Sequence, residues 1–271
     1  MKALSAAAVA AILFTQALTS CKSKDESPKQ TCGILTETDS TIDNGSINSL
    51  PNGKHLWYFD ILGRPIKSVY TITDSPASTT TDLFTYSADG NIIFHNTQNG
   101  SLKDSAWLNA GRIVKERTSL GTSTYTYDAN GYLTGSVSNL VEGNNAVTGV
   151  FTWSGGNLIH SDYSYASGND KNQYADITYG TLANKWVSEG PILRQMFLGV
   201  FPRRFYGKAQ TNLPVILTGS TPQGASLKTD TYSYILNADG SVARITVGTR
   251  NANANENSTK YYLIKYGTTC E

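Results

Sequence analysis

The sequence predicts an all-β protein made of successive antiparallel hairpins, and three observations support this fold class. The composition favours strands and turns, because Tyr occurs 16 times and Gly 24 times among 271 residues. Aromatic and polar residues alternate in short runs, as in "YTYDANGYLTG" at 125–135. Glycine stands at each expected corner, where the chain needs a positive φ. The chain is long enough to bury a sizeable core.

The stretch at 125–135 shows the repeating hairpin unit most clearly. Tyr125 and Tyr127 fall on one face of a strand and Thr126 on the other. The Asp128 side chain is expected to cap a type I turn, and Gly131 to take the positive φ that follows it. A second strand then begins, which makes a β-hairpin with a bulged turn. Looser copies are "FTYSADGNII" at 84–93, "FTWSGGNLI" at 151–159 and "YSYILNADGSVARI" at 232–245.

The same pattern of turn residues predicts the turns and strands in the rest of the chain. It predicts turns near Gly63, Gly90, Gly111, Gly131, Gly156 and Gly240. Strands are expected at 54–60, 66–73, 80–86, 91–97, 112–119, 122–127, 132–138, 147–153, 157–165, 173–179, 212–218, 228–237, 241–248 and 259–266. A meander of this length must curl or close, because long open edges invite aggregation. We therefore predict a strongly curved sheet or a barrel.

Residues 182–211 break the alternation. Pro191 and Gly199 bracket a stretch with apolar residues at helical spacing, which predicts one short helix near 190–200. In one interpretation this segment is a cap or plug over the end of the curved sheet. In the other it forms a ligand pocket, with candidate contacts Trp186, Phe201, Arg203, Arg204 and Tyr206. Both interpretations require apolar cover, so both stay open.

Residues 1–20 have the pattern of a secretory signal: a Lys at position 2, an apolar stretch, and small residues up to position 20. The stretch is too short for a resident membrane helix. The end of this segment and the residue after it, Leu18-Thr19-Ser20-Cys21, resemble the lipobox of bacterial lipoproteins. The resemblance implies cleavage before Cys21 and lipid attachment to its sulfur, and more than one acyl chain makes such an anchor stable. We expect a lipidated Cys and flexible tether over 21–32, then a single domain over 33–271.

The tether contains Lys24-Asp25-Glu26, which is similar to the surface-export signal of Bacteroidota lipoproteins. The resemblance implies an outer-membrane lipoprotein exposed at the cell surface. The alternative is an anchor that faces the periplasm.

The cysteines are Cys21, Cys32 and Cys270. With Cys21 carrying lipid, an exported and oxidising setting favours a disulfide between Cys32 and Cys270, at the two ends of the domain. Two unpaired thiols are the alternative. A metal site is not expected, because no His lies next to either Cys.

Charge and motifs argue against several function classes. The formal net charge is +1, with 22 basic and 21 acidic residues, so no nucleic-acid partner is expected. His55, His95 and His160 stand far apart in sequence, and most acids fall in turns such as those at Asp60 and Asp128. No nucleophile, zinc or phosphate-binding motif is present, so we expect neither enzymatic activity nor a cofactor.

Two resemblances follow from the hairpins. The unit at 125–135 resembles the tyrosine-aspartate repeats of Rhs-type proteins, with matches at Tyr125, Tyr127, Asp128, Gly131 and Leu133. Residues 50–270, including "YGKAQTNLPVIL" at 206–217, resemble an uncharacterised Bacteroidota lipoprotein domain described as porin-like in fold. This resemblance implies a barrel-like shape and carries no activity. A membrane-spanning porin needs strands of about ten residues with an apolar outer band. Runs such as "STYTYD" are shorter and more polar, so we take the likeness as one of shape.

These observations favour a lipid-anchored binding or interaction module for a glycan, a peptide or an outer-membrane partner. A purely structural envelope component is the alternative, and a hydrolase without a recognisable motif is a further one. A contiguous exposed aromatic patch would favour binding, whereas scattered tyrosines would favour a scaffold.

Overall fold

The structure is a computed structural model of the chain. It describes residues 31–38, 41–43, 46–48, 53–60, 62–72, 79–97, 103–140, 146–166, 173–185, 201–221, 226–252 and 257–265.

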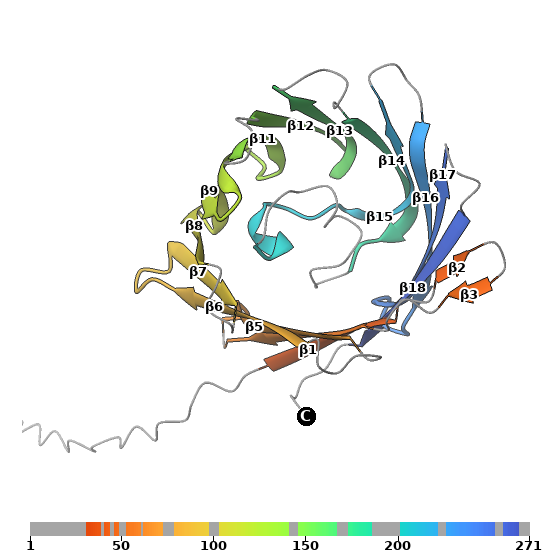
Figure 1. The fold of residues 1–271 in the computed structure, drawn as a ribbon, viewed down its shortest axis with the longest axis horizontal. Helices are drawn as coiled ribbons and strands as arrows, with labels where there is room; N and C mark the ends of the chain where they lie inside the picture. Colours follow the sequence, from red (N-terminus) through yellow and green to blue (C-terminus); the bar gives the residue numbers. More distant parts are fainter. Residues whose placement is uncertain are drawn as a thin grey trace, which may run out of the picture.

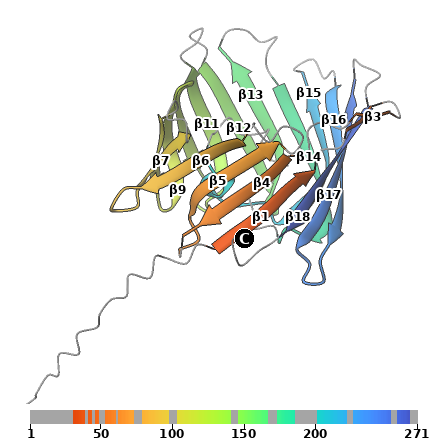
Figure 2. The ribbon, with the colours of Figure 1, turned by 60° about the horizontal axis from the view of Figure 1, so that its bottom comes forward.

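Sixteen of the described strands form a closed antiparallel barrel (Figures 1 and 2). From β4 to β18, strands that are consecutive in the chain are neighbours in the sheet. The first strand, β1, closes the ring, because it pairs with β18 on one side and with β4 on the other. The prediction of a curled or closed meander is therefore confirmed.

The barrel strands are β1 (Thr31–Thr38), β4 (Gly53–Phe59), β5 (Pro65–Ile72), β6 (Thr79–Tyr86), β7 (Ile92–Thr97), β8 (Lys103–Asn109), β9 (Arg112–Thr118), β10 (Gly121–Tyr127), β11 (Leu133–Leu140), β12 (Ala146–Ser154), β13 (Asn157–Tyr165), β14 (Gln173–Ala183), β15 (Asn212–Ser220), β16 (Ser226–Leu236), β17 (Val242–Asn251) and β18 (Asn257–Lys265). A small hairpin, β2 (Thr41–Asp43) with β3 (Ser46–Asn48), lies outside the ring beside β18 (Figure 1).

The strand expectations missed β1, β2, β3 and β8. In β8 the inward positions are Asp104 and Ala106, both buried. Because one of these residues is acidic and the other is small, the sequence of β8 shows no alternation of large apolar and polar residues. In β1 the two large apolar residues, Ile34 and Leu35, are adjacent rather than alternating.

The tight turns confirm the turn chemistry expected from the sequence. Gly63, Gly131 and Gly240 take positive φ values of 71°, 90° and 81°. Asp128 Oδ1 accepts a hydrogen bond from the Tyr132 backbone N–H at 2.8 Å, and Asp239 acts likewise toward Ser241. The β10–β11 register shifts between Thr126 and Tyr127, as a bulged turn requires.

In an antiparallel meander every second connection lies at the same end. The turns around Gly63, Gly90, Gly111, Gly131, Gly156 and Gly240 therefore share one end of the barrel, which we call the turn end. The opposite end, which we call the loop end, carries the β9–β10 connection at 119–120 and the last residues of β5, β7, β11, β13, β15 and β17.

The hydrophobic core faces the inside of the barrel. In β12, for example, Val147 and Phe151 are buried while Thr148 and Thr152 are exposed. The first aromatic of each unit, such as Phe84, Tyr125 and Phe151, belongs to this core. The exposed large hydrophobic side chains among the described residues are scattered over the outer wall and turns, and none of them is a Tyr or a Trp.

The second aromatic of each unit locks neighbouring hairpins together. The Tyr127 hydroxyl on β10 donates to the backbone carbonyl of Ile113 on β9 at 2.6 Å. Four other side chains repeat this bond, which we call the inter-hairpin clamp: Tyr86 to Pro65, Trp153 to Leu133, Tyr179 to Leu158, and Tyr234 to Pro214. The repeated aromatic-x-aromatic pattern is therefore a unit of scaffold.

The residue before the accepting carbonyl covers the clamp ring in three of these cases. Arg64 lies over Tyr86 at 4.2 Å, Arg112 over Tyr127 at 5.3 Å, and the Tyr132 ring packs on Trp153 at 4.6 Å. These three clamps therefore combine a hydrogen bond with ring stacking or a cation–π contact.

Residues 201–211, at the end of the insertion, lie inside the ring, and we call them the plug segment (Figure 1). It contains one 3-10 turn, η3 (Arg203–Phe205). Backbone hydrogen bonds join it to the turn end, from Lys208 N–H to the Gly131 carbonyl and from Thr211 N–H to the Gly156 carbonyl, each at 3.0 Å. The predicted plug is confirmed for these residues. The predicted helix near 190–200 lies within 186–200, outside the described residues.

Candidate functional site

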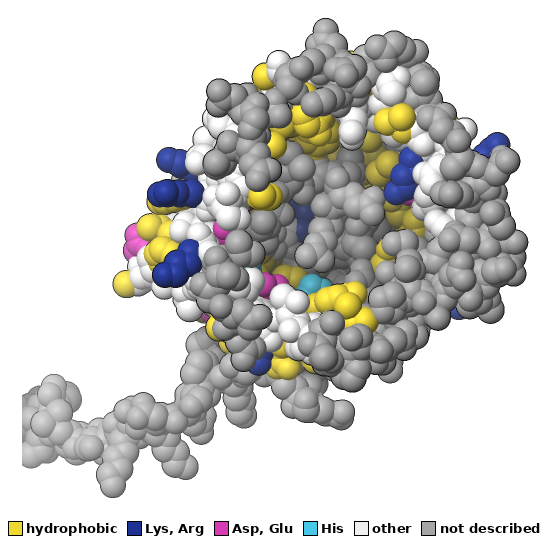
Figure 3. Space-filling view, viewed as in Figure 1, with side chains coloured by type: hydrophobic (Ala, Val, Ile, Leu, Met, Phe, Trp, Pro, Cys, Tyr) yellow, Lys and Arg dark blue, Asp and Glu magenta, His cyan; other side chains and the backbone are white. Residues whose placement is uncertain are grey.

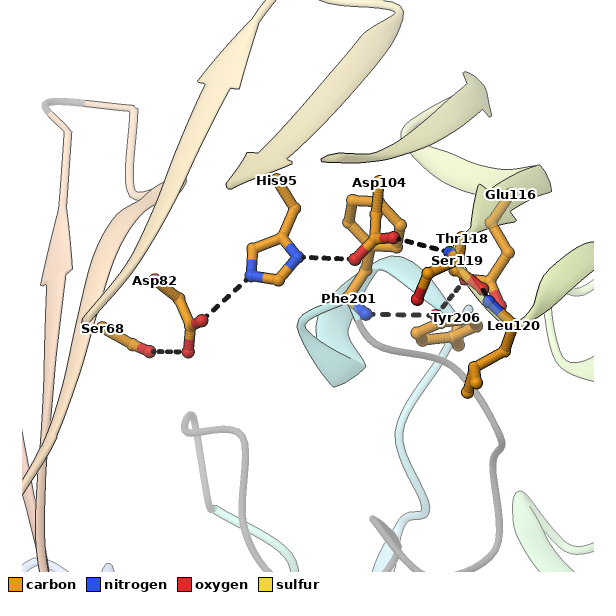
Figure 4. Close-up of polar contacts among 10 residues, drawn as sticks. All are labelled: Ser68, Asp82, His95, Asp104, Glu116, Thr118, Ser119, Leu120, Phe201 and Tyr206. Carbon is orange, nitrogen blue, oxygen red and sulfur yellow. Dashed lines mark hydrogen bonds and ion pairs between the residues drawn. The ribbon is translucent and has the colours of Figure 1, made fainter. Parts of the chain in front are cut away.

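A row of polar side chains crosses four adjacent strands on the inner wall (Figure 4). Ser68 on β5 donates its hydroxyl to Asp82 on β6 at 3.1 Å. His95 on β7 contacts Asp82 through Nε2 at 3.1 Å and Asp104 on β8 through Nδ1 at 2.9 Å. We call Ser68, Asp82, His95 and Asp104 the inner polar row.

Side chains alternate between the two faces of each strand, and this alternation turns the inner polar row toward the inside of the barrel. Asp82 is in phase with the inward Phe84, His95 with Ile93, and Asp104 with Ala106. Register completes the arrangement, because Ser68 pairs with Asp82 and His95 with Asp104 in the sheet. Each strand therefore contributes one polar side chain, set among apolar neighbours.

His95 is held as an imidazolium. Both of its ring nitrogens face carboxylate oxygens, which only accept hydrogen bonds, so both nitrogens must donate. Only 6% of the residue is exposed, and burial opposes the charge. The hydrogen bonds and attraction of Asp82 and Asp104 outweigh that burial and raise the His95 pKa. The Phe84 ring stacks on the imidazole with centroids 5.1 Å apart.

Glu116 on β9 forms a second buried polar centre. It is 2% exposed, and its two oxygens accept hydrogen bonds from the hydroxyls of Tyr125 at 2.6 Å and Tyr206 at 2.7 Å. Burial raises the Glu116 pKa although these hydrogen bonds work in the other direction. Next to it, the hydroxyls of Ser123 and Ser138 pair at 2.8 Å.

The plug segment rests on both centres. The Phe201 ring meets His95 edge-on, with centroids 6.1 Å apart, and Tyr206 donates to Glu116 (Figure 4). The Tyr206 hydroxyl also accepts the Phe201 backbone N–H at 3.4 Å. Two polar centres on the barrel wall thus hold the inner face of the plug.

These two centres hold the plug segment in place, and we call the inner polar row together with Glu116, Tyr125 and Tyr206 the latch. Both His95 nitrogens are engaged by carboxylates, and the Ser68 hydroxyl donates to Asp82 instead of approaching the imidazole. The arrangement therefore does not provide a base beside a nucleophile, which acyl transfer needs. Its acids neutralise the imidazolium and orient it.

The structure gives most of the predicted ligand-contact residues protein partners. Phe201 and Tyr206 are buried in the core. Arg204 donates to the Gly63 carbonyl and lies over the Phe59 ring at 5.1 Å. Arg203 lies in η3, and Trp186 is outside the described residues. Contact of these five residues with a ligand stays a prediction.

The cysteine predictions also stay open. Cys21 and Cys270 lie outside the described residues, and Cys32 is described only as backbone in β1.

Sequence reasoning missed the inner polar row, because it treated His95 as isolated and did not consider Asp82 or Asp104. The signal was present. Each of these residues sits two positions from an inward apolar residue on a short strand, so the strand pattern places its side chain inside. The Glu116 centre was missed as well, because Tyr206 is 90 residues away in sequence.

His160, the third histidine, lies on the outer wall. It contacts Asp176 on β14 at 2.6 Å and Asp162 at 3.0 Å, and its ring stacks on Tyr174. Among the described residues, no group of three or more His, Cys, Asp or Glu is arranged to hold a metal ion. In the same part of the chain, no helix is long and apolar enough to cross a membrane.

Comparison with known proteins defines the fold class. No protein-family model matches the chain, and no curated protein matches it. Among solved structures, a porin-like protein from Bacteroides uniformis ATCC 8492 matches with a TM-score of 0.61 and 13% identity, covering 88% of this chain and 97% of that one. A porin-like protein from Bacteroides vulgatus ATCC 8482 matches with a TM-score of 0.54 and 15% identity, covering 86% and 99%. The chain thus has the fold of these porin-like proteins.

Proposed function

We propose that this protein is a lipid-anchored envelope protein whose barrel serves as a rigid binding module outside the bilayer. The orientation of the core supports this location. A membrane-spanning barrel carries an apolar band outside and a polar interior. Here the large buried apolar and aromatic side chains face inward, and outward positions such as Thr124, Thr148 and Thr229 are polar.

The observation that carries the proposal is the use of the interior by the protein itself. The aromatic core, the inter-hairpin clamps and the latched plug all occupy the inside of the barrel. Figure 3 shows hydrophobic side chains on the inner wall of the barrel. Partners are therefore expected at the outer wall and the loop end. We propose a non-catalytic role, because the His and acids of the inner polar row use their hydrogen-bonding groups on one another.

The anchor gives the barrel an orientation. Thr31, the first residue of β1, pairs with Phe59 beside the Gly63 turn, so the chain enters the barrel at the turn end. If Cys21 carries lipid, residues 22–30 connect it to that end, and nine residues span at most about 30 Å. The plugged turn end would face the membrane and the loop end would project away from it.

Two exposed leucines test this arrangement as a matched pair. Leu62 lies in the β4–β5 turn at the turn end and is 71% exposed, and Leu120 lies in the β9–β10 connection at the loop end and is 62% exposed. A photo-crosslinking amino acid at position 120 is expected to capture a glycan, peptide or membrane-protein partner in intact cells. The same probe at position 62 should capture lipid.

Capture of no partner from position 120 or from other outer-wall positions would favour the purely structural alternative. Cys21→Ala should move the protein from the membrane fraction to the soluble fraction. Protease treatment of intact cells then separates surface exposure from the periplasm-facing alternative.

A further inference from the structure

Charge is segregated across the barrel wall on β5 to β9. The acids of these strands, Asp82, Asp104 and Glu116, all point inward into the latch. Four of the five Lys and Arg residues of the same strands point outward, namely Lys67, Lys103, Lys115 and Arg117, and the fifth, Arg112, lies over the Tyr127 ring near the turn end.

Sheet register establishes the outward positions. Lys67 pairs with Leu83, whose neighbours Asp82 and Phe84 face inward. Lys115 pairs with Trp107 and Arg117 with Ser105, each one position away from an inward residue of β8. Lys103, Lys115 and Arg117 are exposed. Among the described residues none of the four cations forms a salt bridge.

Aromatic rings lie between these cations. The Phe94 side chain on β7 is outward and 40% exposed. Lys115 lies over the Trp107 ring at 5.3 Å, and Lys67 over the Tyr58 ring at 5.1 Å. Figure 3 shows Lys and Arg side chains beside hydrophobic ones on the flank over β7 to β9, with an acidic side chain at its edge. We call Lys67, Phe94, Lys103, Trp107, Lys115 and Arg117 the basic-aromatic wall.

This charge pattern is local. The acids nearest to the wall in sequence are turn residues, Asp60, Asp89 and Asp128, which cap their own turns at the turn end. On the outer faces of β13 and β14 the acids Asp162 and Asp176 lie against His160. The molecule has a formal net charge of only +1, so the wall is a concentration of positive charge on one flank.

We propose that the basic-aromatic wall binds an acidic polysaccharide. The inference rests on the proposed binding function and names the ligand class and its surface. Cations spread over several strands match negative charges repeated along a polymer. The exposed Phe94 ring among them suits the apolar face of a sugar ring. The wall lies along the flank of the barrel, whereas the lipid anchor would hold the turn end to the bilayer, so a membrane surface is the less suited occupant.

The test uses purified full-length protein and polygalacturonate, a uronic-acid polymer, as the probe. Binding is expected at low salt and should weaken as salt rises, because exposed charges are screened. The double substitution Lys115→Gln with Arg117→Gln should weaken binding about tenfold. Phe94→Ser should weaken it without any change of charge. The matched control, Arg244→Gln with Arg250→Gln, removes two cations from β17 and should leave binding unchanged.

Each outcome has one meaning. Equal loss in the wall and control variants would overturn the proposal, since binding would then follow net charge alone. Equal binding of dextran, a neutral polymer, would also overturn it. Stronger binding to poly-glutamate would point to an acidic protein, and stronger binding to phosphatidylglycerol vesicles to a lipid surface. If crosslinking from position 120 captures a partner and polygalacturonate does not bind, the proposed function survives and this inference fails.

Discussion

At the scale of single residues, Glu116 is the centre on which the latch depends. Removing its carboxyl group in Glu116→Ala leaves two buried phenol hydroxyls without an acceptor and opens a cavity, so we expect a loss of about 3 kcal/mol in the free energy of unfolding. Glu116→Gln keeps the volume and one acceptor without the buried charge, so it should stay within about 1 kcal/mol of wild type. Urea denaturation at pH 7 measures both, and equal losses would show that the hydrogen bonds do not matter.

His95 gives the fold a pH dependence. Its folded pKa is raised above the ordinary value of 6.5 by Asp82 and Asp104 acting against burial. The stabilisation is therefore fully present below pH 6.5 and is lost as the pH rises through the folded pKa. We expect the free energy of unfolding to fall over that range in wild type and to lose this dependence in His95→Gln. A flat wild-type profile across this range would contradict the imidazolium assignment.

At the scale of elements, the inter-hairpin clamp is the recurring device. Tyr127→Phe removes the donor to the Ile113 carbonyl and keeps the ring under Arg112, so we expect a loss of about 1 kcal/mol. Tyr132→Phe is the control in the same hairpin, since the Tyr132 ring packs on Trp153 and its hydroxyl forms no such bond. Its effect should stay within about 0.5 kcal/mol. Thermal unfolding of the two variants decides the matter, and equal shifts would mean that the clamp adds nothing beyond packing.

The plug depends on a close approach between two loops. Gly207 has φ +96°, and a Cβ there would lie 2.7 Å from the Gly131 carbonyl oxygen and 2.9 Å from the Tyr127 ring. Gly207→Ala should therefore cost about 3 kcal/mol through strain and clash. Gly63→Ala has a similar φ of +71° with nothing within 4 Å of the new methyl group, so it should cost about 1 kcal/mol. Limited proteolysis alongside thermal unfolding would show whether the plug leaves the ring, and equal costs would contradict the contact.

The elements show what sequence can predict here. Hairpins were predictable because aromatic alternation, turn Asp and positive-φ Gly agree locally, as at Tyr125, Asp128 and Gly131. β8 was not, because its inward residues Asp104 and Ala106 break the apolar pattern. The clamps and the latch were also missed, since each joins side chains whose proximity follows from register across strands. The Tyr206–Glu116 bond needs the plug in place, and no local rule predicts that.

At the scale of the whole molecule, closure depends on β1, which joins the last strand to β4. Cys32 lies in β1 opposite Tyr58, and Ile34 pairs with Lys265, five residues before Cys270. Cys32 therefore lies at the turn end, one strand away from the end of β18, and Cys270 follows that end by five residues in the sequence. A disulfide there would close a loop of roughly 240 residues, with up to about 5 kcal/mol of stabilisation in the chain-entropy model.

We expect mass spectrometry of unreduced digests to link the peptides that carry Cys32 and Cys270. Reduction should then lower the melting temperature, and Cys32→Ser with Cys270→Ser should reproduce that lowered value with no further response to reductant. The reason is specific to a closed meander: the seam joins the two ends of the chain, so it has the largest loop entropy of any strand pair. Free thiols at both positions in the exported protein would reject the bond. Closure would then depend on the β1–β18 and β1–β4 ladders alone.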